Sequence, residues 1–277
     1  MAANINIIRF LFSNVGPIFP NIAATVGVNL FYSPRRFEKK AAEKDIEQYG
    51  ETFYFNSRKG KLKLYHWKGK RSENVLLVHG WEGRATQLHK FVQPILNEGF
   101  SVLAFDGPAH GDSEGKKTTL PFFSQAIEDI CQTYRVKYII AHSFGAGGSA
   151  IAISNGLSID KAVFISAPFS VENVVNRFGK YLKIPYRVSE KMHKIMENEK
   201  WHAKSRECFS FHTLGKTIDI PLLIIHDKRD KYVSYEDGCK IHECCKNSEF
   251  MSTDGYGHGA IIEKDVVINR SMEFLFR

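Results

Sequence analysis

The chain has 277 residues and a mass of 31.6 kDa, with 43% apolar, 13% aromatic and 25% charged residues. A chain of this length and composition can bury a full hydrophobic core, which excludes intrinsic disorder and fibrous repeats. The formal net charge is +8, of which ten Lys or Arg and five Glu between residues 168 and 217 supply +5. This excess has no dense basic cluster interleaved with aromatics, so it indicates a solvated basic face, or one that steers acidic partners, and no nucleic-acid site.

The five cysteines form an odd set without the spacing of a disulfide framework, which favours reduced thiols and a cytoplasmic protein. They are Cys131, Cys208, Cys239, Cys244 and Cys245. Cys239, His242 and Cys245 share a roughly helical spacing that could suit zinc, but a closed site usually takes a second pair of ligands from another segment. The sequence therefore predicts buried, inert thiols, with no metal and no cofactor.

The first 31 residues carry one charged side chain, Arg9, and Pro17 and Pro20 interrupt them. No apolar run approaches the roughly 18 residues of a membrane span, and the basic start of a signal peptide is missing. Two interpretations stay open. The segment forms two short helices packed against the domain, or it lies on a membrane or lines the entrance for a lipid-like substrate, which would give a peripheral membrane contact.

Beyond a polar, charged stretch over residues 34–50, short apolar segments alternate with helix-length ones. Segments 51–57 and 61–67 predict a hairpin joined at Gly60, and nearly continuous apolar runs follow at 74–80, 100–107, 136–143, 161–168 and 220–227, with a last strand at 248–253. Helices are expected over 85–98, 120–134 and 144–156. We therefore predict an α/β fold with a mostly parallel eight-stranded sheet and helices on both faces.

One connection is too long for a simple crossover, because about fifty residues separate the strands at 161–168 and 220–227. We interpret residues 169–216 as a helical cap inserted after the sixth strand, over the carboxyl edge of the sheet where ligands of open α/β sheets bind. The expected organisation is an N-terminal helical segment over 1–50, a core domain over 51–168 and 217–277, and the cap between its two parts.

The stretch AHSFGAG places Ser143 between an apolar strand and a small-residue helix, with Ala141 and Gly145 as small neighbours. A nucleophile elbow needs this arrangement, because strand and helix pass close together around the serine. Taken alone, the match also suits an ordinary helix N-cap.

A reactive serine needs a base to take its proton, and the base needs an acid. Asp227 and Asp230 follow a buried strand, and His258 lies in a glycine-flanked loop near the C-terminus.

From about residue 51 onward the chain resembles the α/β-hydrolase superfamily. The segments that carry the resemblance are LLVHGWEGRA, AFDGPAHGDSEG, AHSFGAG, HDKRDKYV and GYGHGAI, in the family's order. Together with Pro34-Arg35-Arg36, the first and fourth further resemble a group of bacterial hydrolases of undefined substrate. The resemblance implies the α/β-hydrolase fold and a capped serine hydrolase.

The resemblance also implies roles for single residues. Ser143 matches the nucleophile and His258 the general base, while the register of the acid loop favours Asp230 over Asp227. Backbone N–H groups of Trp81 and Phe144 match the oxyanion hole.

Other polar residues of these motifs match supporting positions. His79, Asp106 and His110 are expected to organise loops, and His226 to be structural. His142 is expected to point away from the reacting side and pack against neighbouring strands. Glu82 and Arg84 could touch substrate or brace their loop.

These residues predict attack of Ser143 on a carbonyl and hydrolysis of an acyl-enzyme. The first hypothesis is a hydrolase of carboxylic esters or thioesters. Its substrates would be small molecules, and those with a hydrophobic acyl group are among the candidates. A second is an acyltransferase that passes the same acyl group to an alcohol or thiol. A third is a non-catalytic binding protein on this scaffold. The sequence leaves substrate, acyl length and oligomeric state open.

Overall fold

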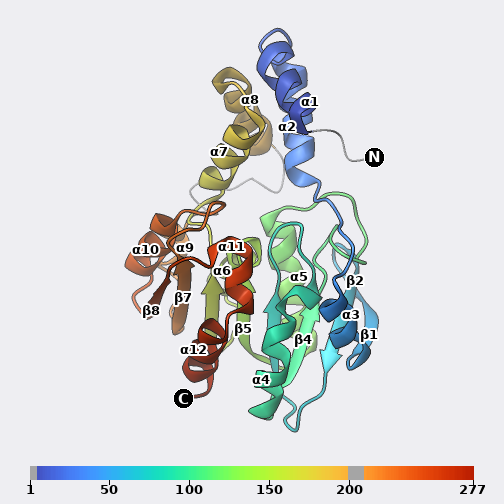
Figure 1. Cartoon of the computed structure of the whole chain (residues 1–277), viewed down its shortest axis with the longest axis vertical. Helices are drawn as coiled ribbons and strands as arrows, with labels where there is room; N and C mark the ends of the chain where they lie inside the picture. Colours follow the sequence, from blue (N-terminus) through green and yellow to red (C-terminus); the bar gives the residue numbers. More distant parts are fainter. Residues whose placement is uncertain (1–4, 199–208) are drawn as a thin grey trace.

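The computed structural model describes residues 5–198 and 209–277 of the chain. Its strands form one sheet of eight in the order β1-β2-β4-β3-β5-β6-β7-β8 (Figure 1). The strands are β1 (Glu51–Ser57), β2 (Gly60–Trp67), β3 (Asn74–Val78), β4 (Ser101–Phe105), β5 (Val136–His142), β6 (Lys161–Ile165), β7 (Leu222–Asp227) and β8 (Ser248–Thr253). β2 pairs antiparallel with β1 and β4, and all other neighbours are parallel. The predicted α/β-hydrolase fold, with its mostly parallel eight-stranded sheet, is confirmed.

Helices cover both faces of this sheet and stand above its upper edge in Figure 1. They are α1 (Ile5–Phe10), η1 (Leu11–Val15), α2 (Pro20–Tyr32), α3 (Ala41–Gln48), η2 (Ala85–Phe91), α4 (Val92–Asn97), α5 (Leu120–Thr133), α6 (Phe144–Ser154), α7 (Val171–Leu182), α8 (Tyr186–Asn198), α9 (Phe211–Leu214), α10 (Tyr235–Cys244), α11 (Gly257–Ala260), η5 (Ile261–Glu263) and α12 (Asp265–Phe276). The helix expected over 85–98 is divided into the 3-10 helix η2 and the α-helix α4, and the backbone at Leu88, within η2, is not helical.

Two apolar clusters on opposite faces of the sheet explain the nearly continuous apolar runs. All five residues of β3 are buried. Leu76 and Val78 pack into the cluster that contains residues of α5 and α6, whereas Val75 and Leu77 pack into the one that contains residues of η2, α4 and α12. Since successive side chains of a strand point to opposite faces, a strand covered on both sides must be apolar at every position.

A third apolar cluster lies away from the sheet and joins the N-terminal helices to the long connection after β6. In it, Ala24 and Val28 of α2 pack with Val188 and Met192 of α8. The two helices come close at Gly27, where an added Cβ would lie 2.6 Å from the Met192 sulfur. We call α1, η1, α2, α7 and α8 the upper helical layer, which stands beyond the carboxyl edge of the sheet (Figure 1).

Two features of the helices bear on the expected division into N-terminal segment, core and cap. The N-terminal helix α2 packs on α8, so the helices above the sheet come from two distant segments and not from the insertion alone. Conversely, α9 lies within the range expected for the cap, yet Phe211 and Leu214 pack in the sheet's own core cluster. In the part of the chain that is described, no helix is long and apolar enough to cross a membrane.

Candidate active site

Ser143 occupies a strained turn between β5 and α6. Its backbone has φ 52° and ψ −117°, a region that non-glycine residues rarely adopt and that is found at functional sites. Its N–H donates to the Ile165 carbonyl oxygen at 2.9 Å, which ties the turn to the next strand. The turn therefore has the sharp strand-to-helix geometry that holds a serine hydroxyl clear of the sheet.

The small neighbours expected around the serine are required by close backbone approach. A Cβ on Gly145 would lie 2.4 Å from the His79 carbonyl oxygen, and one on Gly80 would lie 3.1 Å from the Cβ of Ser143. Contacts below about 3 Å are not tolerated by real Cβ atoms, so a glycine is needed at position 145. The approach at Gly80 also brings the loop after β3 beside the serine.

The structure brings three of the predicted site residues together. The His258 ring lies with Nε2 3.0 Å from Ser143 Oγ and with Nδ1 2.7 Å from Asp230 Oδ2. When Nδ1–H donates to the carboxylate, Nε2 carries no hydrogen and can accept the serine proton. Ser143 follows β5, Asp230 follows β7 and His258 begins α11 after β8, so each comes from the carboxyl end of a different strand.

The Asp230 carboxyl stays ionised although its side chain is fully buried. Burial raises its pKa, but His226, His258 and the N–H of Val233 outweigh burial and hold the pKa of Asp230 well below its usual value. The N–H groups of Tyr232 and Val233 each donate to Oδ1 at 2.8 Å. A fixed negative charge therefore faces His258, ready to stabilise an imidazolium.

Asp227, the alternative acid, does not contact the His258 ring in this structure. Burial raises the pKa of Asp227, but hydrogen bonds to its carboxylate have the larger effect and lower the pKa to about 2. The donors are the hydroxyl of Thr253 and the N–H groups of Gly257, Tyr256 and Arg229. The Thr253 hydroxyl donates to Oδ2 at 2.7 Å and the Gly257 N–H donates to Oδ1 at 2.9 Å. Asp227 thus fixes the loop that carries His258.

His142 makes a contact that sequence reasoning missed. Its Nε2 lies 2.9 Å from the carbonyl oxygen of His258, and the two rings are 4.8 Å apart between centroids. Burial, together with the charge of His258, lowers the pKa of His142 to about 3. A neutral ring with a hydrogen on Nε2 therefore donates to the backbone of His258, so His142 supports the histidine loop instead of only packing against strands.

Two backbone amides that sequence reasoning assigned to an oxyanion hole are available. In the described part of the chain, neither the N–H of Trp81 nor that of Phe144 donates a hydrogen bond. The first follows β3 in the loop that approaches Ser143, and the second begins α6 directly after the serine. Backbone N–H groups without a partner, placed next to a nucleophile, can donate hydrogen bonds to the oxyanion that forms only during the reaction.

His79, Asp106 and His110 connect loops, as expected. The Gly107 N–H donates to His79 Nε2 at 2.8 Å, and the Ala85 N–H donates to Asp106 Oδ1 at 2.8 Å. The Glu82 N–H donates to His110 Nε2 at 3.0 Å, and burial lowers the pKa of His110 to about 4, which keeps that nitrogen free to accept. These contacts hold the loops after β3 and β4 in one position.

The Pro-Arg-Arg stretch fastens the upper helical layer to the same loops. Arg35 donates to both carboxylate oxygens of Glu82, at 2.8 and 2.7 Å. Arg36 donates to the carbonyl oxygens of Ser113 and Gly115, at 2.6 and 3.1 Å. Glu82 therefore braces its loop. Arg84 does the same, since it is buried and its Nε lies 3.4 Å from a carboxylate oxygen of Glu43.

His226 is also placed as expected, in a structural position. Its ring is fully buried, with Nε2 3.2 Å from the Val233 carbonyl oxygen and 3.6 Å from Asp230 Oδ2. The ring packs so closely on Gly238 that an added Cβ there would lie 2.6 Å from Nδ1. His226 is therefore part of the support of Asp230 and has no route to a substrate.

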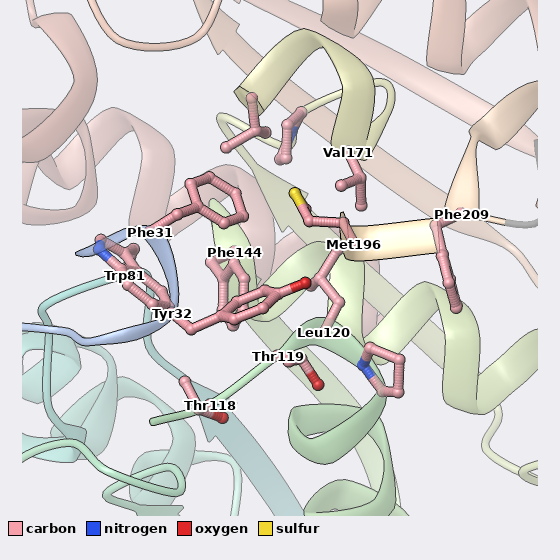
Figure 2. A pocket seen from close by; sticks show the side chains of 13 residues that line it. Phe31, Tyr32, Trp81, Thr118, Thr119, Leu120, Phe144, Val171, Met196 and Phe209 are labelled. Atoms are coloured by element: carbon pink, nitrogen blue, oxygen red, sulfur yellow. The ribbon is translucent and has the colours of Figure 1, made fainter. Parts of the chain in front are cut away.

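An apolar pocket opens beside the serine turn, between the sheet and the upper helical layer (Figure 2). Trp81 and Phe144 line it from the core, Phe31 comes from the end of α2, and Met196 comes from α8. The remaining lining residues are Tyr32, Thr118, Thr119, Leu120, Pro121, Pro168, Val171, Val174 and Phe209. One interpretation left open from the sequence was that residues 1–31 line a substrate entrance, and Phe31 of that segment lies in this wall. The full set of lining residues could not be predicted, because it comes from segments far apart in the chain.

The cysteines of the described ranges carry no comparable site. Among the residues that the structure describes, no group of three or more His, Cys, Asp and Glu side chains is placed to hold a metal ion. His242 Nδ1 lies 2.7 Å from the Ser248 hydroxyl, and burial raises the pKa of the Cys131 and Cys245 thiols to about 12. Cys208 lies outside the described residues.

Several solved structures share the fold of this chain. The esterase Pf2001 of Pyrococcus furiosus superposes with a TM-score of 0.67 at 24% identity, over 87% of this chain and 98% of that one. The match shows a common fold over nearly the whole of both chains.

Sequence comparisons identify the family. Residues 75–237 match the model of the alpha/beta hydrolase family, and the chain therefore belongs to that family. The bifunctional esterase/perhydrolase DCH of Acinetobacter calcoaceticus is 25% identical over 79% of this chain and 97% of its own length. Human protein ABHD12B is 27% identical over 69% of this chain, and this chain spans about half of it, 55%.

Proposed function

We propose that this protein is a serine esterase, a hydrolase of carboxylic esters or thioesters that works through an acyl-enzyme on Ser143. The observation that carries the proposal is the contact chain from Ser143 Oγ to His258 Nε2, 3.0 Å, and from His258 Nδ1 to Asp230 Oδ2, 2.7 Å. Similarity to an enzyme described as an esterase/perhydrolase supports the same chemistry.

The proposed reaction begins when His258 Nε2 accepts the proton of Ser143 and the serine oxygen attacks the carbonyl carbon. The N–H groups of Trp81 and Phe144 stabilise the negative oxygen that develops; loss of one such donor costs about 3 kcal/mol or more in a related setting. His258 then returns the proton to the leaving alkoxide or thiolate. Water attacks the acyl-enzyme with His258 again as base, and Asp230 stabilises the imidazolium in both steps.

The apolar pocket supports a hydrophobic acyl group as the part of the substrate that is bound. Its walls are mostly apolar, and Trp81 and Phe144 belong to both the pocket lining and the proposed oxyanion hole. An acyl chain in the pocket would therefore bring its carbonyl next to Ser143. In this proposal the upper helical layer acts as the cap over the site, with residues 169–198 and the N-terminal helices both contributing.

A cytoplasmic location forms the last part of the proposal. The cysteines in the described ranges, Cys131, Cys239, Cys244 and Cys245, are all unpaired. Unpaired thiols are typical of a reducing compartment.

Two experiments test the proposed function. A fluorophosphonate probe should label the wild-type protein and should not label Ser143→Ala. Esters and thioesters of increasing acyl length should be hydrolysed with a preference for hydrophobic chains, again only with Ser143 present. Labelling that persists in Ser143→Ala would remove this serine from its role, and no labelling of the wild type would favour a non-catalytic binding protein.

A further inference from the structure

The end of the upper helical layer farthest from the sheet exposes large apolar side chains to solvent. Ile18 is 68% exposed, Ile22 66% and Phe10 61%. Four further large side chains of residues 7–22 are also exposed, namely Ile7, Leu11, Val15 and Phe19. Seven large apolar side chains exposed within the sixteen residues 7–22 are uncommon on a soluble domain and indicate a site of interaction.

The α7–α8 turn belongs to the same surface. Arg9 Nε donates to the Tyr181 carbonyl oxygen at 2.8 Å, and the Ser13 hydroxyl donates to the Lys183 carbonyl oxygen at 3.3 Å. Tyr181 is 52% exposed and Tyr186 is 78% exposed. We call residues 7–22 together with residues 180–187 the apolar tip, and it stands at the top of Figure 1.

The charges of the apolar tip are all positive. Arg9, Lys180, Lys183 and Arg187 are its only charged residues, and it contains no Asp or Glu. None of these four forms an ion pair within the described part of the chain. The next acidic residue along α8, Glu190, accepts a hydrogen bond from the Tyr186 hydroxyl at 3.0 Å. Within the described ranges the apolar tip therefore combines exposed Phe, Ile and Leu with four cations that have no acidic partner, of which Arg9 also stacks on the Tyr181 ring.

We propose that the apolar tip docks this protein onto an anionic lipid bilayer as a peripheral protein. Exposed Phe, Leu and Ile side chains would enter the boundary between headgroups and acyl chains, the level at which tyrosines such as Tyr181 and Tyr186 are also favoured. The four cations would lie against anionic headgroups. Charge decides against a second copy of the chain, because self-association would bring two sets of unpaired cations together.

Docking leaves the candidate active site above the bilayer. The apolar tip includes the start of α2, whereas Phe31 and Tyr32 at its other end line the pocket. A helix of 13 residues is about 20 Å long at about 1.5 Å per residue. Binding thus depends on none of the residues proposed for catalysis, and Ser143→Ala should bind vesicles as the wild type does, which separates this proposal from the proposed function.

The test is co-sedimentation of the full chain with phosphatidylglycerol vesicles and with phosphatidylcholine vesicles. The wild-type protein should pellet with phosphatidylglycerol vesicles and should bind phosphatidylcholine vesicles at least about tenfold more weakly. Its binding to phosphatidylglycerol should weaken as the salt concentration rises. The double variants Ile18→Ser/Phe19→Ser and Lys183→Glu/Arg187→Glu should each reduce partitioning by about tenfold or more. Thermal unfolding checks that both variants remain folded.

Matched controls lie away from the apolar tip. Tyr49→Ser/Val266→Ser removes two exposed apolar side chains, and Lys44→Glu/Lys70→Glu makes the same change in net charge on exposed residues. Both should bind like wild type. The proposal fails if wild type stays in the supernatant with phosphatidylglycerol, or if the control and tip variants bind alike. The proposal also fails if the wild-type protein does not bind vesicles and light scattering shows a dimer that the tip variants disrupt. The apolar tip would then bind a second copy of the chain.

Discussion

Asp227 and Asp230 are two buried carboxylates three positions apart, and their partners give them different tasks. Asp227 accepts hydrogen bonds from the N–H groups of Arg229, Gly255, Tyr256 and Gly257 and from the Thr253 hydroxyl, which shape a loop. Asp230 accepts from two backbone N–H groups and faces the His258 ring. A carboxylate that accepts hydrogen bonds from backbone N–H groups orders the loop around it. A carboxylate that accepts from an imidazole N–H fixes the tautomer of that base and stabilises its charged form.

Replacing the two aspartates separately should give different kinetic results. Asp230→Asn should lower kcat for a soluble ester by about 10⁴-fold, because an amide facing Nδ1 favours the tautomer that cannot accept the serine proton. Asp227→Asn should lower kcat by less than about 100-fold, through a looser histidine loop. Steady-state kinetics on one ester measure both, and equal losses would contradict the assignment.

The same pair predicts a dependence of stability on pH. The pKa of Asp227 is lowered from 3.8 to about 2, so its ionised form stabilises the fold above pH 4 by about 2 kcal/mol, and this is lost as the pH falls from about 4 to 2. Urea unfolding of wild type and Asp227→Asn at about pH 5 and pH 3 measures it. Wild type should lose about 1 kcal/mol more than the variant over that interval, and parallel losses would refute the assignment.

His142 should act as a positioning residue through the His258 backbone. His142→Ala removes the donor to the His258 carbonyl oxygen and should lower kcat by about 10- to 100-fold with little change in KM, since small displacements of a base are costly. His142→Gln, whose amide can reach the same oxygen, should restore most of the loss. If alanine and glutamine behave alike, the contact has no role in positioning.

At the scale of elements, the pocket is the feature that pairs the sheet with the upper helical layer. One wall follows β3 and β5 and carries Trp81 and Phe144, and the other comes from α2, α7 and α8. The two arginines after α2 fix this arrangement, because Arg35 and Arg36 bind the loops after β3 and β4. The acyl group accepted is therefore expected to depend on the helices, whereas the reaction depends on the loops.

Filling the pocket from α7 should change acyl preference without changing the chemistry. Val174→Trp places a large side chain in the lining and should lower kcat/KM for long-chain esters by about 10- to 100-fold, while acetyl esters are affected by less than about threefold. Val266→Trp, on the exposed side of α12, is the matched control. An equal loss for short and long chains would place the acyl group elsewhere.

At the scale of the whole molecule, the upper helical layer has its own apolar cluster, separate from the two that flank the sheet. Polar contacts join it to the core at the Pro-Arg-Arg stretch and at Asp237 of α10, which accepts from Asn173 at 3.1 Å and from Arg177 at 3.3 Å. Phe31 also stacks on Trp81 with ring centroids 6.4 Å apart, and Val171 packs against both the layer's cluster and a cluster of the sheet. A unit that is built around its own apolar cluster can open without the core unfolding.

This separation predicts the result of loosening the layer. Met192→Ala removes a buried side chain between α2 and α8 and should cost the layer about 2–4 kcal/mol. Amide hydrogen exchange in α2 and α8 should accelerate by about 30-fold or more, and that in β5 and β6 should stay unchanged. Equal acceleration in the strands would show that layer and core unfold together.

The fold was open to sequence reasoning because strands and sharp turns depend on local rules. A strand covered on both faces must be apolar throughout, as in β3, and a serine in a turn as sharp as that at Ser143 needs a glycine such as Gly145 beside it. The residues alone left Asp227 and Asp230 both open as the acid, and the resemblance to the α/β-hydrolase superfamily favoured Asp230. The order of strands and loops placed both aspartates and His258 after strands whose carboxyl ends lie at one edge of the sheet.

Tertiary structure alone decided what depends on long-range packing. The pairing of α2 with α8, the pocket wall and the contact from His142 to His258 join residues more than 100 positions apart, and no local spacing encodes such neighbours. The sequence by itself determined the strands and the sharp turn at Ser143, since backbone geometry and burial constrain them locally. Tertiary packing determined what surrounds the candidate site, because the apolar pattern of a helix does not specify which distant helix or strand it packs against.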